Sequence, residues 1–434
     1  MRAVTNVAVT VHHTKGTSMK SASAASKVAV GIAIVAISAT ACGGSSSGGK
    51  NDAVSPQNSM SASPSTSSSA STDTTATAAA TLRAGLDQLF REHVNLTGFT
   101  VQTAVASGIT SPNTAQALKA LDGNTVDLGD AVGSVYGPAA RTAFLKLWRA
   151  HIGFFVDYTK GLATNDKKLV SSAQAKLANY KQDFSKFLGD ATQIPASAIA
   201  TELQGHIQTL EAAIQSIVTK KPDAAAKLQM AAEHMDGTAA ALAGGIAKEK
   251  NLPGNAAGDA SNLRAALTGL LVQHVAQTGA VVQTAVATGL TSPQTGGAVK
   301  ALDKNTVDLG DAIGSVYGAD ARTAFLKLWR AHIGFFVEYT KGLATNDKKL
   351  VSSAQAKLAN YKRDFADFLG SATGLPADAV ASDLQGHITT LEDAIQAIVS
   401  KSPTAAAKIS MAQTHMAGTA AVLAKAIAAQ KNLS

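Results

Sequence analysis

Histidine is the residue type in this chain whose number and spacing suggest chemistry. The 434 residues include ten histidines, of which two lie near the N-terminus and eight form two sets of four, separated by a constant offset of 181 residues. The first set is His93, His151, His206 and His234, and the second is His274, His332, His387 and His415. An imidazole can ligate a transition metal, ligate haem iron or transfer a proton.

Most of these histidines are predicted to face the protein interior. His93, His151 and His206 each belong to a run of apolar residues spaced three or four apart, which is typical of the buried face of a helix. A buried neutral imidazole needs a partner for each ring nitrogen, so four inward rings in one set are costly unless they share a ligand. We therefore predict one metal site in each set.

Other candidate ligands accompany the histidines. Met230 lies one turn before His234 and Met411 one turn before His415, so each thioether shares a helix face with an imidazole. Imidazole with thioether indicates copper before another transition metal, and haem held by His/His or His/Met is the alternative. The candidates for orienting the ligands, or for satisfying the histidines without any cofactor, are Asn124, Asp127, Tyr180, Asn305, Asp308 and Tyr361.

The chain shows no recognisable catalytic constellation. It contains no His-Glu-x-x-His, and the absence of Glu-x-x-His argues against a carboxylate di-iron centre. A single cysteine excludes a disulfide framework and a thiolate metal cluster. We therefore predict a binding protein rather than an enzyme.

Long helices must position these side chains, and the helical part of the sequence is duplicated. Residues 141–184 and 322–365 differ at two of 44 positions, within copies that occupy residues 82–249 and 263–434 and are joined by a linker over 250–262. Apolar periodicity and Gly or Pro breaks divide the first copy into six helical segments. These span residues 82–107, 112–136, 138–163, 166–190, 195–219 and 223–248. Short loops between long helices predict an all-α fold of two tandem, homologous up-and-down bundles.

Residues 1–42 resemble a bacterial lipoprotein signal, for which Met19 is a more natural start than Met1. An apolar run over 28–37 follows basic residues, and Ala39-Thr-Ala-Cys42 is similar to a lipobox. The resemblance implies cleavage before Cys42 and a lipid on its sulfur. We therefore expect an extracytoplasmic protein anchored to the cell membrane.

Residues 43–81 are rich in Ser, Thr and Ala and predict a disordered tether. Residues 1–81 contribute +3 of the net charge of +8, and the helical copies contribute +5 from basic and acidic residues that are interleaved. Such charges indicate solvated helix faces, so nucleic acid is a poor candidate partner, while envelope proteins remain possible partners of unknown identity.

A resemblance to a known family rests on the run Leu147-Trp-Arg-Ala-His-Ile-Gly-Phe-Phe-Val-Asp-Tyr158, with Leu203-Gln-Gly-His206 downstream. This pattern is similar to a helical domain of secreted Gram-positive bacterial proteins, some of which are named after the copper amine oxidase N-terminal domain. The similarity covers residues 82–434 and implies a helical fold. Oxidase activity does not follow from it, because the quinone cofactor of those enzymes forms at Tyr within Asn-Tyr-Asp/Glu, and the nearest string here is Asn179-Tyr180-Lys181.

Taken together, the sequence predicts a lipid-anchored extracytoplasmic protein that binds a metal ion, copper first, or haem, through inward-facing histidines in each bundle. The alternative is a cofactor-free structural or interaction lipoprotein of the cell envelope, whose histidines are satisfied by protein partners.

Overall fold

The computed structural model describes residues 73–434, and within this range the chain forms α-helices and one short 3-10 helix, with no strand. The predicted all-α fold class is confirmed. The lipoprotein signal, Cys42 and most of the predicted tether lie outside the described residues. The tether prediction is wrong at its C-terminal end, because the first helix begins at Ala78 and buries Ala79 and Ala80 completely.

The helices are long and joined by short turns. The first copy contains α1 (Ala78–Ser107), α2 (Pro112–Ala163), α3 (Lys167–Thr192), α4 (Ala196–Val218) and α5 (Ala224–Glu249). The second copy contains α6 (Asp259–Thr288), α7 (Pro293–Tyr317), α8 (Ala319–Ala344), α9 (Lys348–Thr373), α10 (Ala377–Val399) and α11 (Ala405–Lys431). A 3-10 turn, η1 (Thr74–Ala76), precedes α1.

The long helix α2 is two helices joined at a kink. Gly137 has φ 85° and ψ 174°, outside the helical region, and Pro138 follows it. The equivalent Gly318, with φ 90°, separates α7 from α8 in the second copy. A positive φ suits glycine because it has no Cβ. The break predicted at Gly137 is therefore present, and each copy has six helical segments.

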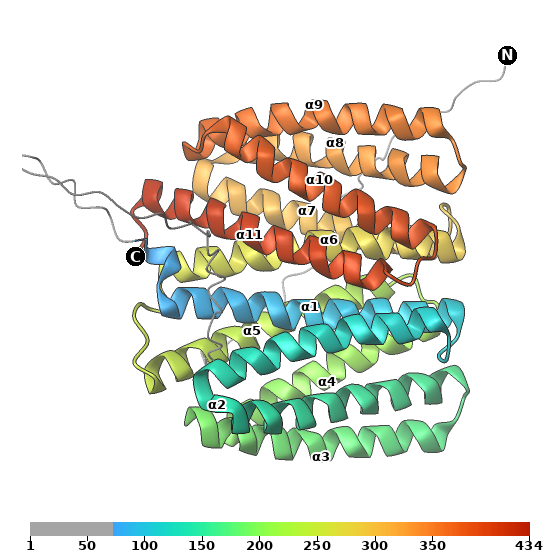
Figure 1. The fold of residues 1–434 in the computed structure, drawn as a ribbon, viewed down its shortest axis with the longest axis vertical. Coiled ribbons are helices and arrows are strands. Elements are labelled where there is room, and N and C mark those ends of the chain that lie inside the picture. Colours follow the sequence, from blue (N-terminus) through green and yellow to red (C-terminus); the bar gives the residue numbers. More distant parts are fainter. Residues whose placement is uncertain (1–72) are drawn as a thin grey trace, which may run out of the picture.

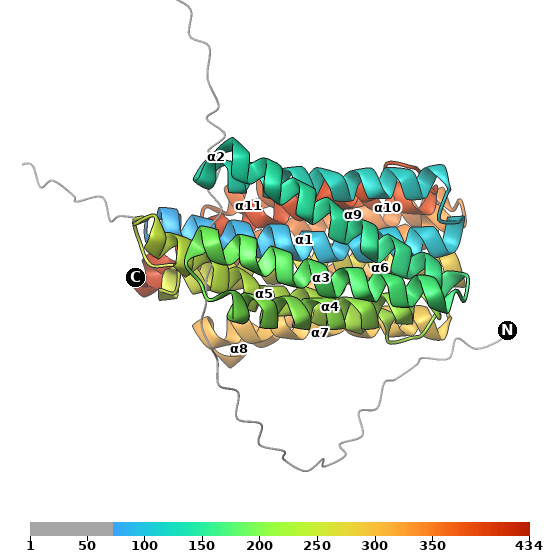
Figure 2. The same ribbon diagram turned by 90° about the horizontal axis from the view of Figure 1, so that it is seen from below.

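The two copies pack against each other through their first helices. Helices α1 and α6 contact each other in the middle, with α2–α5 on one side and α7–α11 on the other (Figure 1). Seen from below, the helices of the two copies overlap and run along a common direction (Figure 2). Each copy buries its own apolar core, one around Leu86, Trp148 and Leu210 and the other around Leu271, Trp329 and Leu391. The molecule therefore consists of two bundles that share a helix–helix contact.

One pair of hydrogen bonds between the copies is related by the repeat. Asn113 at the start of α2 donates to the carbonyl of Lys401 at 3.2 Å, and Gln294 at the start of α7 donates to the carbonyl of Lys220 at 2.9 Å. The donors and the acceptors are each separated by the 181-residue offset of the repeat. Such reciprocal contacts indicate an approximate two-fold axis between the bundles.

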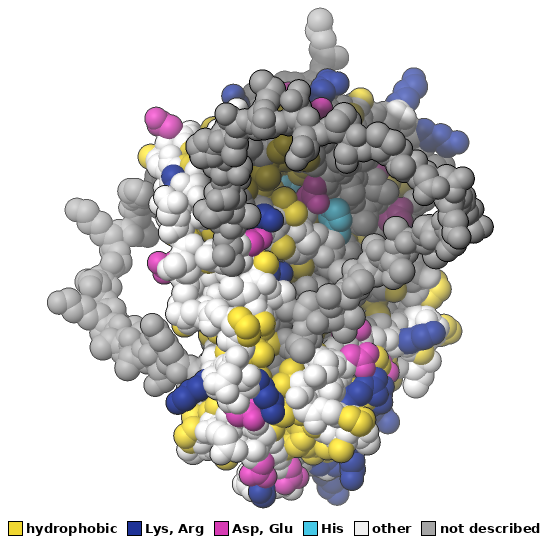
Figure 3. Space-filling model, turned by 60° about the vertical axis from the view of Figure 1, so that its left-hand side comes forward, with side chains coloured by type: hydrophobic (Ala, Val, Ile, Leu, Met, Phe, Trp, Pro, Cys, Tyr) yellow, Lys and Arg dark blue, Asp and Glu magenta, His cyan; other side chains and the backbone are white. Residues whose placement is uncertain are grey.

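The central helix α6 is apolar because of its position. It is long and apolar enough to cross a membrane, with a mean hydropathy of 1.3 over its best window, but 83% of that window is buried inside the fold. Packing against α1 and α11 accounts for this composition. On the outer face shown in Figure 3, basic and acidic side chains of the described residues are interspersed.

One close approach between the copies depends on glycine. A Cβ at Gly297 of α7 would overlap the carbonyl oxygen of Pro222 in the α4–α5 turn, whereas a Cβ at the adjacent Gly296 would meet nothing within 4 Å. We predict that Gly297→Ala forces the copies apart and lowers the free energy of unfolding by about 2 kcal/mol. Chemical denaturation would measure the change.

Gly296→Ala is the matched control, because it makes the same chemical change on the solvent side of α7. It should leave stability unchanged or raise it by up to ~1 kcal/mol through helix propensity. Equal effects of the two substitutions would contradict this packing of α7 on the first copy.

Candidate metal centre

Three histidine rings from different helices of the first bundle meet in its interior. His93 comes from α1, His151 from the second half of α2 and His206 from α4, and each is at most 5% exposed. The Nε2 atoms of His93 and His151 are 3.4 Å apart. One ring nitrogen from each of the three residues lies within 4.8 Å of the others. We call these residues the first His triad.

The second bundle repeats the arrangement. His274 of α6, His332 of α8 and His387 of α10 are buried, and the Nε2 atoms of His274 and His332 are again 3.4 Å apart. Their ligand nitrogens also lie within 4.8 Å of one another. This second His triad means that three of the four predicted histidines of each copy converge.

Aromatic side chains hold the triads in place. Trp148, three residues before His151, meets that imidazole edge-on with ring centroids 4.6 Å apart, and Tyr180 of α3 stacks on it at 4.9 Å. The equivalent Trp329 and Tyr361 contact the second triad at 4.5 and 4.9 Å. The two tyrosines thus lie beside the site as predicted, but they act by ring stacking.

Burial keeps the imidazoles neutral. Removal from water, with a smaller contribution from a neighbouring imidazole, lowers the pKa of His93 and of His206 to about 3. Burial, followed by the other two rings, holds the pKa of His151 well below its usual value, against a smaller opposing effect of the Trp148 backbone. Neutral imidazole is the form that ligates metals, so the triad is ready to bind at physiological pH.

Some ring nitrogens of the triads have no hydrogen-bond partner. Within residues 73–434, neither nitrogen of His206 and neither nitrogen of His387 makes a hydrogen bond, and Nδ1 of His93 makes none. An unpaired buried polar group costs about 1–3 kcal/mol. A cation between three neutral imidazoles would engage one lone pair from each ring, which would remove part of this cost.

The spacing of the nitrogens suits a tetrahedral ion. With metal–nitrogen bonds of ~2.0–2.1 Å, two ligands of a tetrahedron lie about 3.4 Å apart. The Nε2 pairs His93/His151 and His274/His332 have this separation. The third nitrogen of each triad lies within 4.8 Å, so a small rotation of the third ring would complete a three-nitrogen site.

A mainly apolar cavity adjoins each triad. In the first bundle its volume is about 210 Å³, and its lining includes His151, His206 and Trp148. In the second bundle its volume is about 230 Å³, and its lining includes His387 and Trp329. An ion held by three imidazoles keeps a fourth coordination position, and the cavity offers space for a small ligand there.

The fourth histidine of each set lies apart from its triad, so the prediction that all four converge was wrong. Nε2 of His234 on α5 is 3.0 Å from the carbonyl oxygen of Glu202 and 3.8 Å from its carboxylate. His415 makes the same contacts with Asp383, at 3.0 and 3.8 Å. Both side chains are about a quarter exposed, at 26% and 25%. Each is satisfied by its own neighbouring helix.

The predicted thioether ligands, Met230 and Met411, are on the surface. They are 60% and 57% exposed, so neither is a ligand of a triad. The methionines that α5 and α11 bury are Met235 and Met416, each 3% exposed, and these line the cavities beside the triads. Five residues along a helix rotate a side chain by about 140°. The prediction that Met230 and Met411 are ligands was therefore wrong, and the methionine five residues further along each helix faces the cavity.

The polar residues predicted to orient the ligands have other partners. Asn124 donates through Nδ2 to the carbonyl of Leu89 at 3.0 Å, and Asn305 makes the equivalent bond in the second copy at 3.0 Å. Asp127 is exposed, and Asp308 pairs with a lysine at 2.6 Å. These residues tie helices together or face solvent, and the prediction that they support the metal site was wrong.

No protein-family model, curated protein or solved structure matches this chain. The resemblance to a helical domain of secreted Gram-positive proteins therefore stays a prediction. The geometry of the His triads carries the functional argument.

The buried rings predict that the metal-free protein loses stability as the pH falls. A group whose pKa is lowered on folding binds fewer protons in the folded state, so acidification favours unfolding. Between pH 7 and pH 5 the loss should be about 1–2 kcal/mol for each triad ring, because the unfolded imidazole has a pKa of ~6.5. Urea denaturation of the metal-free protein at several pH values would measure it.

A variant without two of the rings separates the effect of the histidines on pH-dependent stability from that of buried carboxyl groups. Burial raises the pKa of Glu92 to about 7 and also raises that of Asp87, and both shifts oppose the effect of the rings. A protein with His206→Leu and His387→Leu keeps these carboxyls but lacks two rings, so its stability should fall less between pH 7 and pH 5. Equal falls in the two proteins would contradict neutral burial of these histidines.

Proposed function

We propose that each helical bundle binds one transition-metal ion through its His triad. The observation that carries this proposal is the convergence of three buried, neutral imidazoles, one of which lacks hydrogen bonds at both nitrogens. A packed apolar core has no need for such a cluster, because aliphatic side chains would fill the same volume without the cost of unpaired polar groups. Two equivalent triads imply two ions in each chain.

Copper is the first candidate for the ion. Imidazole ligands suit copper, zinc, nickel and iron, and among divalent ions a nitrogen site has its highest affinity for Cu²⁺. The triads contain no carboxylate, which argues against Mg²⁺ or Ca²⁺. The exposed Met230 and Met411 no longer support copper, but Met235 and Met416 place a thioether in each adjoining cavity. Zinc, which also accepts three imidazoles, is the second candidate.

Haem fits the triads less well than a single ion. Haem iron takes its axial ligands from opposite faces of the macrocycle, so a wide flat space must separate the two rings. In the first triad, a nitrogen of His206 lies within 4.8 Å of those of both His93 and His151. The third ring therefore stands where the macrocycle would have to lie.

The fourth coordination position favours a small anion or water. Three neutral imidazoles do not balance the charge of a divalent ion, and an unbalanced buried charge is costly. The adjoining cavity of about 210 Å³ is large enough for such a ligand, and Nε1 of Trp148, which has no acceptor within the described residues, is available to donate to it. An open position would also let the ion exchange.

The cellular location is proposed from the leader alone. Ala39-Thr-Ala-Cys42 supports lipidation at Cys42 and retention at the outer surface of a bacterial cell membrane. Metal binding would then take place outside the cytoplasm. Cys42→Ser should move the protein from the membrane fraction to the soluble fraction of expressing cells, and an unchanged distribution would contradict the lipid anchor.

The alternative is a cofactor-free structural or interaction module. The aromatic contacts around His151 favour it, because Trp148 and Tyr180 pack on the ring as they would in an ordinary core. The 3.4 Å separation of the His93 and His151 nitrogens also permits one hydrogen bond between the rings. Metal titration separates this alternative from the proposal.

Metal binding predicts a stoichiometry of two ions per chain. Equilibrium dialysis of the metal-free protein against Cu²⁺, and separately against Zn²⁺, should give two tight sites. His206→Ala should abolish one site, His387→Ala the other, and the double variant both, because each substitution removes one of three ligands from one triad. Metal content after desalting would measure the number retained.

The fourth histidines provide the matched control. His234→Ala and His415→Ala remove imidazoles from the same bundles but outside the triads, so both ions should be retained. A wild-type protein that retains no metal would favour the cofactor-free alternative. Loss of metal in the control variants equal to that in the triad variants would contradict the assigned ligands.

A further inference from the structure

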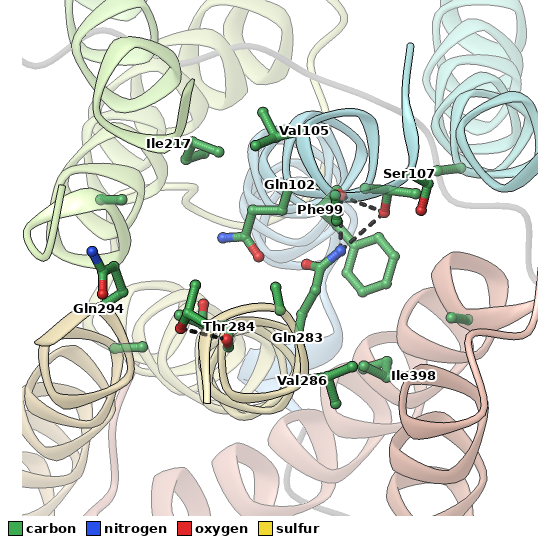
Figure 4. Close-up of a pocket in the computed structure, with 18 of the residues that line it drawn as sticks. Phe99, Gln102, Val105, Ser107, Ile217, Gln283, Thr284, Val286, Gln294 and Ile398 are labelled. Carbon is green, nitrogen blue, oxygen red and sulfur yellow. Dashed lines mark hydrogen bonds between the residues drawn. The ribbon is translucent and has the colours of Figure 1, made fainter. Parts of the chain in front are cut away.

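A second type of site lies between the bundles, apart from both triads. A pocket of about 350 Å³ opens at one end of the α1–α6 contact, beside the α4–α5 and α10–α11 turns (Figure 4). Its volume lies within the range of ~300–1,000 Å³ typical of small-molecule sites. None of the triad histidines lines it, so its occupancy does not depend on the proposed metal function.

Equivalent residues of the two copies line this interbundle pocket in pairs. The pairs include Gln102 with Gln283, Val105 with Val286, and Ile217 with Ile398. The reciprocal bonds from Asn113 and Gln294 to the opposite turns frame the same region. The pocket therefore lies on the approximate two-fold axis, exists only when the copies are docked, and occurs once per chain.

Gln283 presents an unpaired acceptor to the pocket. Its side chain is 9% exposed, and its Nε2 donates to the Phe99 carbonyl at 3.2 Å and to the Thr103 hydroxyl at 2.9 Å. These two bonds fix the amide and turn Oε1 toward the pocket, opposite Gln102 (Figure 4). Neither Gln102 Oε1 nor Gln283 Oε1 has a donor within residues 73–434. Both acceptors at the buried end of the pocket are therefore free to accept a hydrogen bond from a ligand.

The mouth of the pocket is positively charged. Lys220, Lys221 and Lys401 line it, no Asp or Glu does, and within the described residues none of these lysines forms an ion pair. Helices α5 and α11 start beside them and have no side-chain cap, so their N-terminal dipoles also favour an anion. Between the mouth and the glutamines the walls are largely Val, Ile and Ala.

We propose that this interbundle pocket binds an amphipathic monoanion that carries a hydroxyl on its apolar body. The anionic head lies among the lysines, the apolar body lies against Val105, Val286 and Ile398, and the hydroxyl donates to Gln283. 8-Hydroxyoctanoate, an eight-carbon ω-hydroxy acid, combines these three features and serves as the probe.

Three probes separate the contributions of charge and hydroxyl. Isothermal titration calorimetry should show one site per chain for 8-hydroxyoctanoate. Octanoate lacks the donor and should bind about 5-fold more weakly, since one hydrogen bond contributes about 1 kcal/mol. 1,8-Octanediol lacks the charge and should also bind several-fold more weakly. 8-Hydroxyoctyl phosphate has a phosphate head in place of the carboxylate. If it binds more tightly than 8-hydroxyoctanoate, the pocket prefers a phosphate ligand, and if it binds more weakly, the pocket prefers a carboxylate.

Substitutions in the interbundle pocket test whether the ligand binds there. Val105→Trp fills a half-buried wall position and should reduce the affinity for 8-hydroxyoctanoate at least 10-fold, whereas Val337→Trp, at a position 47% exposed on α8, should not change it. Lys220→Ser with Lys401→Ser should weaken binding of the acid several-fold and leave binding of the diol unchanged. This charge variant keeps the test valid should Val105→Trp fail to fold.

The proposal is overturned by any of the following results. These are no binding of either anion at millimolar concentration, equal affinities in the Val105→Trp and Val337→Trp proteins, or equal weakening of acid and diol by the lysine substitutions. A stoichiometry of two would also contradict it, because the copies form only one such pocket. Metal content is measured separately and does not affect the interpretation.

Discussion

The burial of three uncharged imidazoles against one another is the constraint on which each bundle depends. The rings of His93, His151 and His206 come from three helices, so α1, α2 and α4 must hold positions defined by one common point. Trp148 and Tyr180 fix the middle ring by contact. Because the polar nitrogens lack enough protein partners, this arrangement is costly for a core and well suited to a cation.

Duplication places two His triads in one chain and creates a contact surface between the two bundles. Helices α1 and α6 lie next to each other, and Gln283 of α6 donates to the Thr103 hydroxyl of α1 at 2.9 Å. Asn95 of α1 also donates to Gln413 of α11 in the other copy at 3.1 Å. Burial of amides at this contact specifies how the copies dock, since each needs its partner. The docking in turn forms the interbundle pocket on the approximate two-fold axis.

The helices and the three converging histidines of each copy follow from apolar periodicity, because the stripe that buries Leu86 also buries His93. His234 lies outside those apolar runs, and counting it with the other three was the mistake, because its ring meets a backbone carbonyl of the next helix instead. Met230 was predicted to face inward, but Met235 does so instead. Helix α5 has a broad apolar face, so its sequence does not fix which methionine points to the core. Docking of the copies brings equivalent residues, such as Gln102 and Gln283, to the same pocket. A single sequence shows that the two residues are equivalent but not that they lie close together.

The most direct measurement of the central claim is anomalous diffraction from crystals of the copper-loaded protein, collected at the copper absorption edge. The account predicts two strong peaks per chain, each about 2.0–2.2 Å from a ring nitrogen of three histidines, namely His93, His151 and His206 in one bundle and His274, His332 and His387 in the other. Peaks confined to the surface, or located at His234 and His415 while the triads remain empty, would contradict it.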